Sequence, residues 1–336
     1  MTPSIPIFRN EINALGNFRE EVNIASQFTC LGCQRLRRRE HLSSSSTRST
    51  LCRLLPVASA CGALMDMCFM LSVIAVKRNC SLCELLGMNA NVPTDICFSF
   101  AGLMRRGGAT GPHRDGWGIA LYEGKGCRTF HDPKPSAHSE IARFIREYPI
   151  KSRIVICHIR RANRGRIALE NTHPFTRELW GRSWSFAHNG QLRGIKKWPT
   201  AHFRPIRTTD SEHAFCWLMD QLRERWQDAP PPRALYLCLA ELCGTLAEHG
   251  VFNVLLSDSK CLYCFCSTNL VWLTRRAPFQ AATLIDEDLT VDFRKETTPH
   301  DIVTVIATRA LTRDERWVSV ARRKFVAFQG GELAFG

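Results

Sequence analysis

Residues 83–90 are Cys-Glu-Leu-Leu-Gly-Met-Asn-Ala, a short apolar run of the kind that forms a buried strand. The chain changes character at this segment, because residues 1–82 differ in composition from the residues that follow. We therefore expect the folded part of the chain to begin here.

After this run the sequence alternates between strand and helix patterns. Apolar and β-branched residues predict strands at 116–122, 153–159, 183–187, 252–256, 261–266, 302–307 and 324–328. Helical spacing and capping residues predict helices at 96–104, 139–148 and 234–248, and another that starts at Thr209-Asp210. Many strands with pairs of helices predict one layered α/β or α+β domain of roughly 250 residues.

The composition excludes several classes of protein. The chain has 336 residues, of which 45% are hydrophobic and 23% are charged, so it is not a disordered chain, a collagen or a multi-span membrane protein. Its net charge of +14 comes from dispersed basic residues, and no basic stripe with interleaved aromatic residues marks a nucleic-acid groove. We predict a solvated basic surface and no nucleic-acid partner.

The sixteen cysteines are spread through the chain, and several, such as Cys216, Cys238 and Cys264, lie in apolar strings. A free cysteine behaves in such a setting as a small hydrophobic residue. The pattern indicates a reducing compartment rather than a disulfide framework, and hence a cytoplasmic protein.

Residues 1–82 contain an arginine run at 35–39, a Ser/Thr tract at 43–50 and six of the cysteines. Cys30 and Cys33 form a C-x-x-C pair, but no second pair at suitable spacing would complete a zinc site. The apolar run 54–76 is long enough to span a bilayer, although Asp66 within it makes a membrane role unfavourable. A transit peptide, a propeptide, disorder and a stretch that is not translated all remain open for this extension.

Four short segments carry the chemistry. They are 83–87 (Cys-Glu-Leu-Leu-Gly), Arg106-Gly107 with 115–118 (Asp-Gly-Trp-Gly), 158–160 (His-Ile-Arg), and 188–190 (His-Asn-Gly) with 209–212 (Thr-Asp-Ser-Glu). In order and spacing they resemble the class II glutamine amidotransferases, whose nucleophile is the N-terminal residue. The likeness covers about residues 82–336 and is strongest to the stand-alone, single-domain members, which include the γ-glutamyl amide hydrolase of the ergothioneine pathway and its bacterial relatives.

The resemblance implies a fold and a domain division. The fold is α+β, the four-layer αββα sandwich of N-terminal-nucleophile hydrolases, with two stacked, mainly antiparallel sheets between helices. Residues 83–336 would form the type-2 glutamine amidotransferase domain, and residues 1–82 an extension outside its core.

The resemblance also assigns the nucleophile to Cys83. In that family the cysteine starts the mature chain, and its own α-amino group takes the thiol proton, directly or through water. Taken alone, a cysteine before two leucines is more often a buried strand residue.

Asn189 and Gly190 match the oxyanion hole of the family, in which a side-chain amide and a backbone N–H bind the developing negative charge. One donor of this type contributes about 3 kcal/mol to the transition state. The pair Asn-Gly is also a strong signal for a two-residue hairpin turn, which is the alternative interpretation.

The substrate's charged ends would be held by two further residues. Arg160 matches the arginine that binds the glutamine α-carboxylate, and Asp210 matches the acid that binds the α-ammonium, although Asp210 could equally be only a helix N-cap. Arg106 and Gly107 match a supporting pair near the amino terminus of the nucleophile. We expect His158 and His188 to be packing or hydrogen-bonding residues, because the mechanism needs no histidine.

One segment departs from the family pattern. Large synthases have a Trp-Ala-Thr-like sequence after the arginine, whereas residues 161–166 here are Arg-Ala-Asn-Arg-Gly-Arg. Asn163 could replace the hydroxyl contact, so the substrate could be a γ-glutamyl amide other than glutamine.

A free amino group on Cys83 requires that residues 1–82 be absent from the mature protein. Self-processing of a propeptide is one route. The other is that Leu82 is the true initiator, translated as Met from a leucine codon and then removed.

The predicted function is hydrolysis of the side-chain amide of glutamine, or of a related γ-glutamyl amide, through a Cys83 thioester. Glutamate and ammonia or an amine are released, and any ammonia acceptor would be another protein. The alternative is a catalytically silent binding or regulatory protein with the same fold. The sequence predicts no metal site, because His113, His173 and His213 have no other potential metal ligands at suitable spacing. It also predicts no cofactor, and it leaves the oligomeric state open.

Overall fold

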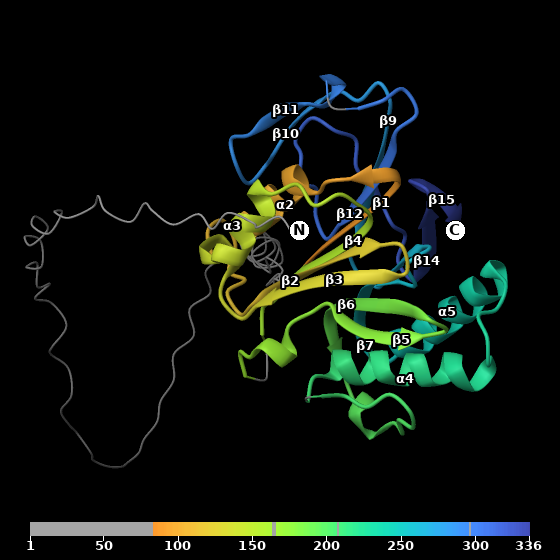
Figure 1. Cartoon of the computed structure of the whole chain (residues 1–336). Helices are drawn as coiled ribbons and strands as arrows, with labels where there is room; N and C mark the ends of the chain where they lie inside the picture. The colour runs from red at the N-terminus through yellow and green to blue at the C-terminus, as the bar shows by residue number, and fades with distance from the viewer. Residues whose placement is uncertain (1–82, 163–165, 207, 296) are drawn as a thin grey trace, which may run out of the picture. The chain divides into compact units, whose positions relative to one another are not determined.

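The computed structural model describes residues 83–162, 166–206, 208–295 and 297–336. Within them the chain forms two large antiparallel sheets, one small hairpin and four α-helices, a mixed α/β arrangement (Figure 1). The helices are α2 (Cys97–Arg106), α3 (Glu140–Glu147), α4 (Asp210–Arg225) and α5 (Pro232–Ala247).

The first sheet has seven strands and contains the predicted nucleophile strand at its centre. In spatial order they are β13 (Val318–Ser319), β9 (Val271–Arg276), β12 (Ile302–Ala307), β1 (Glu84–Thr94), β4 (Ser152–Ile159), β2 (Trp117–Glu123) and β3 (Gly126–Asp132). Each neighbouring pair is antiparallel.

The second sheet has six strands, again antiparallel throughout. Its order is β15 (Glu332–Phe335), β14 (Lys324–Gln329), β8 (Leu262–Cys266), β7 (Gly250–Ser257), β6 (Arg182–Leu192) and β5 (Phe175–Leu179). The separate hairpin consists of β10 (Ala281–Thr283) and β11 (Thr290–Asp292).

Strand β1 is buried on both faces, which explains its nearly continuous apolar sequence. Successive side chains of a strand point to opposite faces. Leu86 and Met88 belong to the core that includes residues of α2 and α3. Leu85 belongs to a different core, shared with Leu255 and Leu262 of the second sheet.

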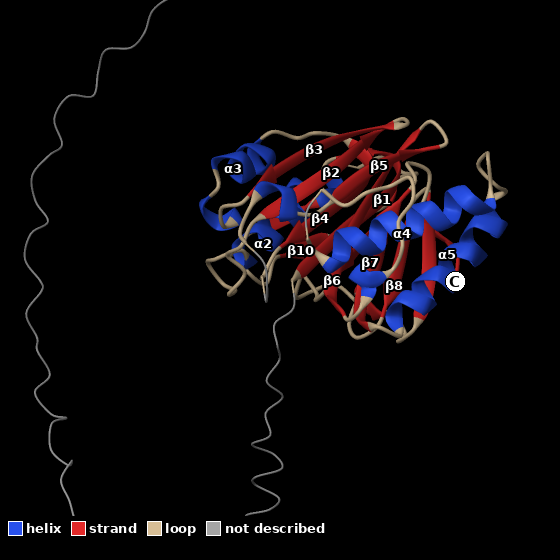
Figure 2. Ribbon diagram, turned by 90° about the horizontal axis from the view of Figure 1, so that it is seen from below, coloured by secondary structure: helices blue, strands red, loops and turns tan. Residues whose placement is uncertain are grey.

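Three apolar cores account for the layering. One joins the first sheet to α2 and α3, one lies between the two sheets, and one joins the second sheet to α4 and α5. Figure 2 shows the strands between the two helix pairs. The active-site candidates contributed by β1 and β6 therefore come from facing sheets.

The four helices and eight strands expected from the sequence are all present, with boundaries shifted by a few residues. Ser139 caps α3 by accepting a hydrogen bond from the backbone of Ala142. Thr209 caps α4 through Glu212 N. Both caps use a hydroxyl to satisfy an N–H group that the first helical turn leaves free.

The sequence patterns missed β3, β5, β9, β10, β11, β13 and β15. Most of these strands lie at or near a sheet edge, and their residues alternate little or are largely exposed, as in β3. Strand β6 also runs five residues beyond its predicted end at 187. Asn189 and Gly190 therefore lie within the strand.

The predicted burial of cysteines in apolar surroundings is confirmed in this part of the chain. The ten cysteines among the described residues are free. Cys216, Cys238 and Cys264 are buried in the apolar cores.

Among the described residues, no helix is long and apolar enough to cross a membrane. The apolar run 54–76 and the Cys30–Cys33 pair lie outside the described residues, so their predictions stay untested.

Tyr122 of β2 provides a polar tie between the two sheets. Its buried hydroxyl donates to the Ser185 hydroxyl at 2.8 Å and lies 3.1 Å from both the Ser183 and Ser257 carbonyl oxygens. These three partners all belong to β6 and β7 of the second sheet.

We predict that Tyr122→Phe lowers the free energy of unfolding by about 1–3 kcal/mol, because it leaves buried polar groups without their partner. Urea unfolding of the two proteins measures the difference. Tyr148→Phe is the matched control, since Tyr148 is 57% exposed, and should change stability by less than about 0.5 kcal/mol. Equal changes in the free energy of unfolding for the two substitutions would contradict a stabilising role of the Tyr122 hydrogen bonds between the sheets.

Candidate functional site

A small cavity of about 80 Å³ brings together four residues predicted from the sequence, namely Cys83, Arg160, Gly190 and Asp210. They come from the start of β1, the end of β4, the end of β6 and the start of α4. The cavity is completed by Arg161, Ala162, His173, His188, Gln191, Thr209 and Ser211.

The position of Cys83 follows from the pairing of β1 with β4. Glu84 pairs with Ile159 and Leu85 with His158, so residue 83 lies beside the segment that leaves β4. There the backbone N–H of Arg161 donates to the Cys83 sulfur at 3.2 Å, and the Cys83 thiol lies 3.5 Å from the Arg161 carbonyl oxygen.

Burial raises the pKa of the Cys83 thiol to about 11, even though the Arg161 backbone and the charge of Arg160 oppose the shift. At neutral pH the sulfur therefore carries its proton. A nucleophilic role for Cys83 would require a base within the site.

Asn189 and Gly190 lie inside β6, paired with Asn253 and Phe252 of β7, so the hairpin-turn interpretation is wrong. A β-carbon at Gly190 would overlap the Val251 carbonyl oxygen. The close approach of β7 therefore requires glycine at this position.

The side chain of Asn189 is fully buried, yet neither its Oδ1 nor its Nδ2 has a hydrogen-bond partner among the described residues. Buried polar atoms are normally paired, and an exception in a native structure calls for an explanation. Its backbone is held firmly, because Asn253 Nδ2 donates to the Asn189 carbonyl oxygen at 3.2 Å. The amide is thus buried on a held backbone, with its hydrogen-bonding capacity unused among the described residues.

Arg160 is almost wholly buried at the end of β4. Its Nη1 group donates to the carbonyl oxygens of Asp115 (3.3 Å) and Arg166 (3.2 Å). Its backbone is clamped by the Asp-Gly segment, through Arg160 N to Gly116 O and Asp115 N to Arg160 O. No bond of the Nε and Nη2 groups occurs within the described residues, which leaves these donors available for an anion.

Asp210 is the first residue of α4, and the cap of that helix is Thr209 rather than Asp210. Asp210 Oδ2 accepts a hydrogen bond from Leu192 N at 2.6 Å, which ties the end of β6 to the helix. The other carboxylate oxygen accepts no bond within the part of the chain that the structure describes, so Asp210 can still bind a cation.

The supporting residues lie outside the cavity lining. Arg106 ends α2 and makes an ion pair with Glu84, the residue after Cys83, at 3.1 Å. Gly107 is the C-cap of that helix, and a β-carbon there would overlap the Ser136 hydroxyl. Asn163 lies outside the described residues, so its predicted contact is untested.

His188 supports the site through two hydrogen bonds. Its Nε2 lies 3.0 Å from the Val251 carbonyl oxygen and must carry the proton, while its Nδ1 lies 2.8 Å from the Ser211 hydroxyl and accepts from it. Burial lowers its pKa, so the ring is neutral and both nitrogens are occupied. This arrangement agrees with the expected hydrogen-bonding role rather than with a general base.

His158 and His173 form a buried pair with ring centroids 4.3 Å apart. Neither ring nitrogen of either residue has a partner among the described residues, and burial lowers the pKa of both well below the usual range. His173 lines the cavity, which sequence reasoning did not anticipate. The missed lining residues His173, Gln191 and Ser211 carry no spacing signal, although Ser211 follows Asp210 directly.

Comparison with known proteins gives consistent matches. The family model for class II glutamine amidotransferases matches residues 82–335. The chain is 59% identical over 252 residues to YafJ of Escherichia coli, provisionally named a glutamine amidotransferase, covering 75% of this chain and 99% of that one. A similarly named Haemophilus influenzae protein is 44% identical over 251 residues, covering 75% of this chain and 85% of the relative.

A solved structure agrees with these matches. The crystal structure of a predicted glutamine amidotransferase from Pseudomonas aeruginosa superposes with a TM-score of 0.62 at 50% identity, covering 75% of this chain and all of that one. The extent of the family match and the identity to these relatives show that this chain belongs to the class II glutamine amidotransferases.

Proposed function

We propose that the chain is an amidohydrolase that cleaves the side-chain amide of glutamine or of a related γ-glutamyl amide. The observation that carries the proposal is the shared cavity, whose lining residues Cys83, Arg160, Gly190 and Asp210 supply a thiol, a buried guanidinium, a backbone N–H and a carboxylate. Asn189 directly precedes Gly190 in β6. Those are the groups that an acyl transfer through a cysteine requires.

In the first half of the reaction, the free α-amine of Cys83 takes the thiol proton and the sulfur attacks the amide carbon. The Asn189 Nδ2 and the Gly190 N–H then donate to the oxyanion of the tetrahedral intermediate. The amine returns the proton to the leaving nitrogen as the carbon–nitrogen bond breaks, which releases ammonia or an amine and leaves a thioester.

In the second half, water gives a proton to the same amine and its oxygen attacks the thioester carbon. The carbon–sulfur bond breaks, the sulfur regains its proton, and glutamate is released. Arg160 and Asp210 hold the α-carboxylate and α-ammonium of the substrate, since both keep unused bonding capacity beside Cys83.

The layering described above supports the four-layer αββα sandwich of N-terminal-nucleophile hydrolases for residues 83–336. The proposed base exists only if residue 83 is the first residue of the mature chain. Residues 1–82 are therefore an extension that is either removed by processing or not translated, because translation starts at Leu82. We place the protein in the cytoplasm, in keeping with its free cysteines.

The decisive test is a glutaminase assay on protein that begins at Cys83. We expect the wild type to release glutamate and Cys83→Ala to have no activity above background, while Cys127→Ala, at another partly buried cysteine, keeps it. Protein with residues 1–82 attached should be inactive until its amino terminus, checked by sequencing, is Cys83. Equal activity of the wild type and Cys83→Ala would instead favour a silent binding protein.

We predict that Asn189→Ala lowers kcat by about 10²- to 10³-fold. Its stability to urea should barely change, because the Asn189 amide makes no hydrogen bond to any described residue. Asn253→Ala is the contrasting variant, and it should lose about 1–3 kcal/mol of stability, since its side chain bonds to Asn189, Ser267 and Thr268. If Asn189→Ala kept the wild-type kcat, Asn189 would not be a donor to the oxyanion.

The pH dependence of kcat/KM should follow the ionisation of the Cys83 α-amine and not that of the Cys83 thiol. The amine works as a base only when unprotonated, so kcat/KM should fall as pH drops through about 7.7–8.0, its ordinary pKa. The Cys83 thiol, whose pKa is raised to about 11, should cause no change in the pH–rate profile near neutral pH. A rate profile that is flat from about pH 6 to about pH 9 would contradict the amine as base.

A further inference from the structure

Glu84 stands out because it is a charged residue at the centre of the first sheet. Its side chain is 2% exposed and follows the proposed nucleophile directly in sequence. Strand alternation turns it away from the second sheet, to the same side as Leu86, so it does not line the cavity that contains Cys83.

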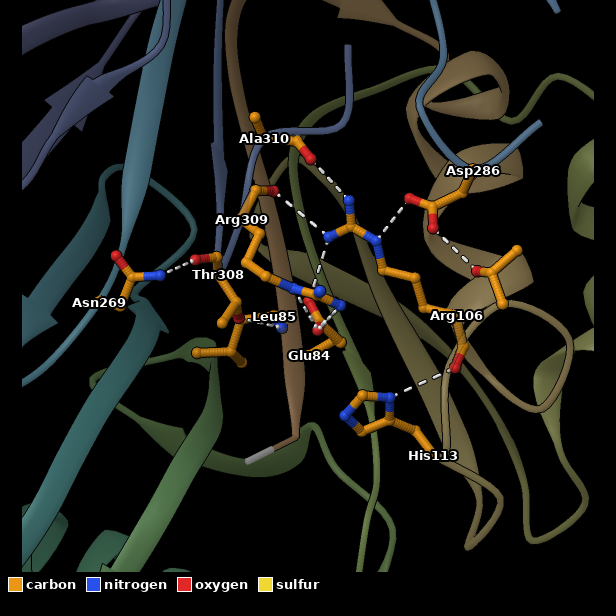
Figure 3. Close-up of polar contacts among 10 residues, drawn as sticks. Glu84, Leu85, Arg106, His113, Asn269, Asp286, Thr308, Arg309 and Ala310 are labelled. Atoms are coloured by element: carbon orange, nitrogen blue, oxygen red, sulfur yellow. Dashed lines mark hydrogen bonds and ion pairs between the residues drawn. The ribbon is translucent and has the colours of Figure 1, made fainter. Parts of the chain in front are cut away.

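The Glu84 carboxylate is bound by two arginines (Figure 3). Arg106 Nη1 donates to Oε2 at 3.1 Å, and Arg309 Nε and Nη2 donate to Oε1 at 3.0 and 2.6 Å. Arg106 ends α2, and Arg309 follows β12, so the carboxylate joins three segments that are far apart in sequence.

Arg106 extends these contacts. Its Nε donates to Asp286 Oδ2 at 2.7 Å, and its Nη2 donates to the Ala310 carbonyl oxygen at 2.6 Å. Asp286 lies in the loop between β10 and β11 and also accepts from the Thr110 hydroxyl at 2.8 Å. We call Glu84, Arg106, Asp286 and Arg309 the Glu84 cluster; it contains two carboxylates and two guanidinium groups, so its charges balance.

The backbone of Leu85, the residue after Glu84, is also held by Thr308, which follows β12. Leu85 N donates to the Thr308 hydroxyl at 2.8 Å, and Thr308 N donates to the Leu85 carbonyl oxygen at 3.1 Å. Residues 84 and 85 are thus fixed by side-chain and backbone contacts, and Cys83 is the next residue outward.

Fold stability alone does not explain the Glu84 cluster. Replacing a buried ion-pair network by apolar residues of similar size is often neutral or stabilising, because taking charges out of water is costly. The neighbouring positions of β1 are apolar, and an apolar residue at position 84 would match them. Its place one residue from the proposed nucleophile suggests a role in the reaction.

We propose that Glu84, held by Arg106 and Arg309, is the positioning residue that fixes Cys83 in the cavity. The inference rests on the proposed function. The ion pairs hold the start of β1 from the helix side, so the sulfur keeps its 3.2 Å contact with Arg161 N and the amine stays beside it. A displacement of about 1 Å in such a geometry costs up to about 100-fold in rate.

The test uses protein that begins at Cys83 and compares Glu84→Gln with the wild type. We expect kcat for glutamine to fall about 10- to 100-fold while KM stays within about twofold, because Arg160 and Asp210 are untouched. Calorimetry should show equal glutamine affinity for Cys83→Ala and for Cys83→Ala with Glu84→Gln. Glu84→Asp should recover part of kcat, since it restores the charge.

Two further variants keep the test decisive. Glu315→Gln removes another carboxylate that is paired with an arginine, in this case Arg275 at 2.7 Å. Neither residue lines the cavity, so kcat should stay unchanged. Should Glu84→Gln fail to fold, Arg309→Gln removes one of the two partners at a side chain that is 55% exposed, and should still lower kcat at constant KM.

A measurement without substrate separates this inference from the proposed function. Burial is the main cause of the raised pKa of the Cys83 thiol, and the charge of Glu84 adds to it, so Glu84→Gln should speed alkylation of Cys83 by iodoacetamide, as followed by peptide mass spectrometry. A wild type that reacts with iodoacetamide but hydrolyses no γ-glutamyl amide overturns the proposed function. Folded Glu84→Gln protein with wild-type kcat and alkylation rate overturns the positioning role.

Discussion

The antiparallel pairing of β1 with β4 is the interaction on which the whole site depends. Its register sets Glu84 opposite Ile159 and Leu85 opposite His158, which places the Cys83 sulfur against the backbone of Arg161. Because side chains alternate along a strand, a slip of one residue would turn Cys83 towards the helices. Both faces of β1 are packed by apolar residues, so this register is the one that buries them.

Several groups in and behind the cavity are held in states that a stable core would avoid. Among the described residues, the amide of Asn189 is buried without partners, and both His158 and His173 are buried with unpaired ring nitrogens. Each of these unpaired groups costs free energy, and the apolar cores of the fold offset that cost. Such groups are expected where a protein binds a ligand, since the ligand supplies the missing hydrogen bonds and charges.

The sequence predicted the long, well-capped elements and the central strands, because their apolar periodicity and capping residues are local signals. It missed the edge strands, since their stability depends on pairing with a neighbour rather than on their own pattern. The Asn-Gly pair shows the limit of local signals. As a dipeptide it favours a turn, yet β7 approaches so closely at Val251 that these residues continue as a strand.

The sequence by itself determined the identity and order of four residues around the cavity, because the motifs with Cys83, Arg160, Gly190 and Asp210 are short and contiguous. It also determined that position 83 begins a buried strand. Only the tertiary structure decided which further side chains meet these residues, such as His173 from a loop and the arginines that hold Glu84. The reason is physical: contacts between segments far apart in sequence arise from sheet register and layer packing, and local sequence does not encode either one separately.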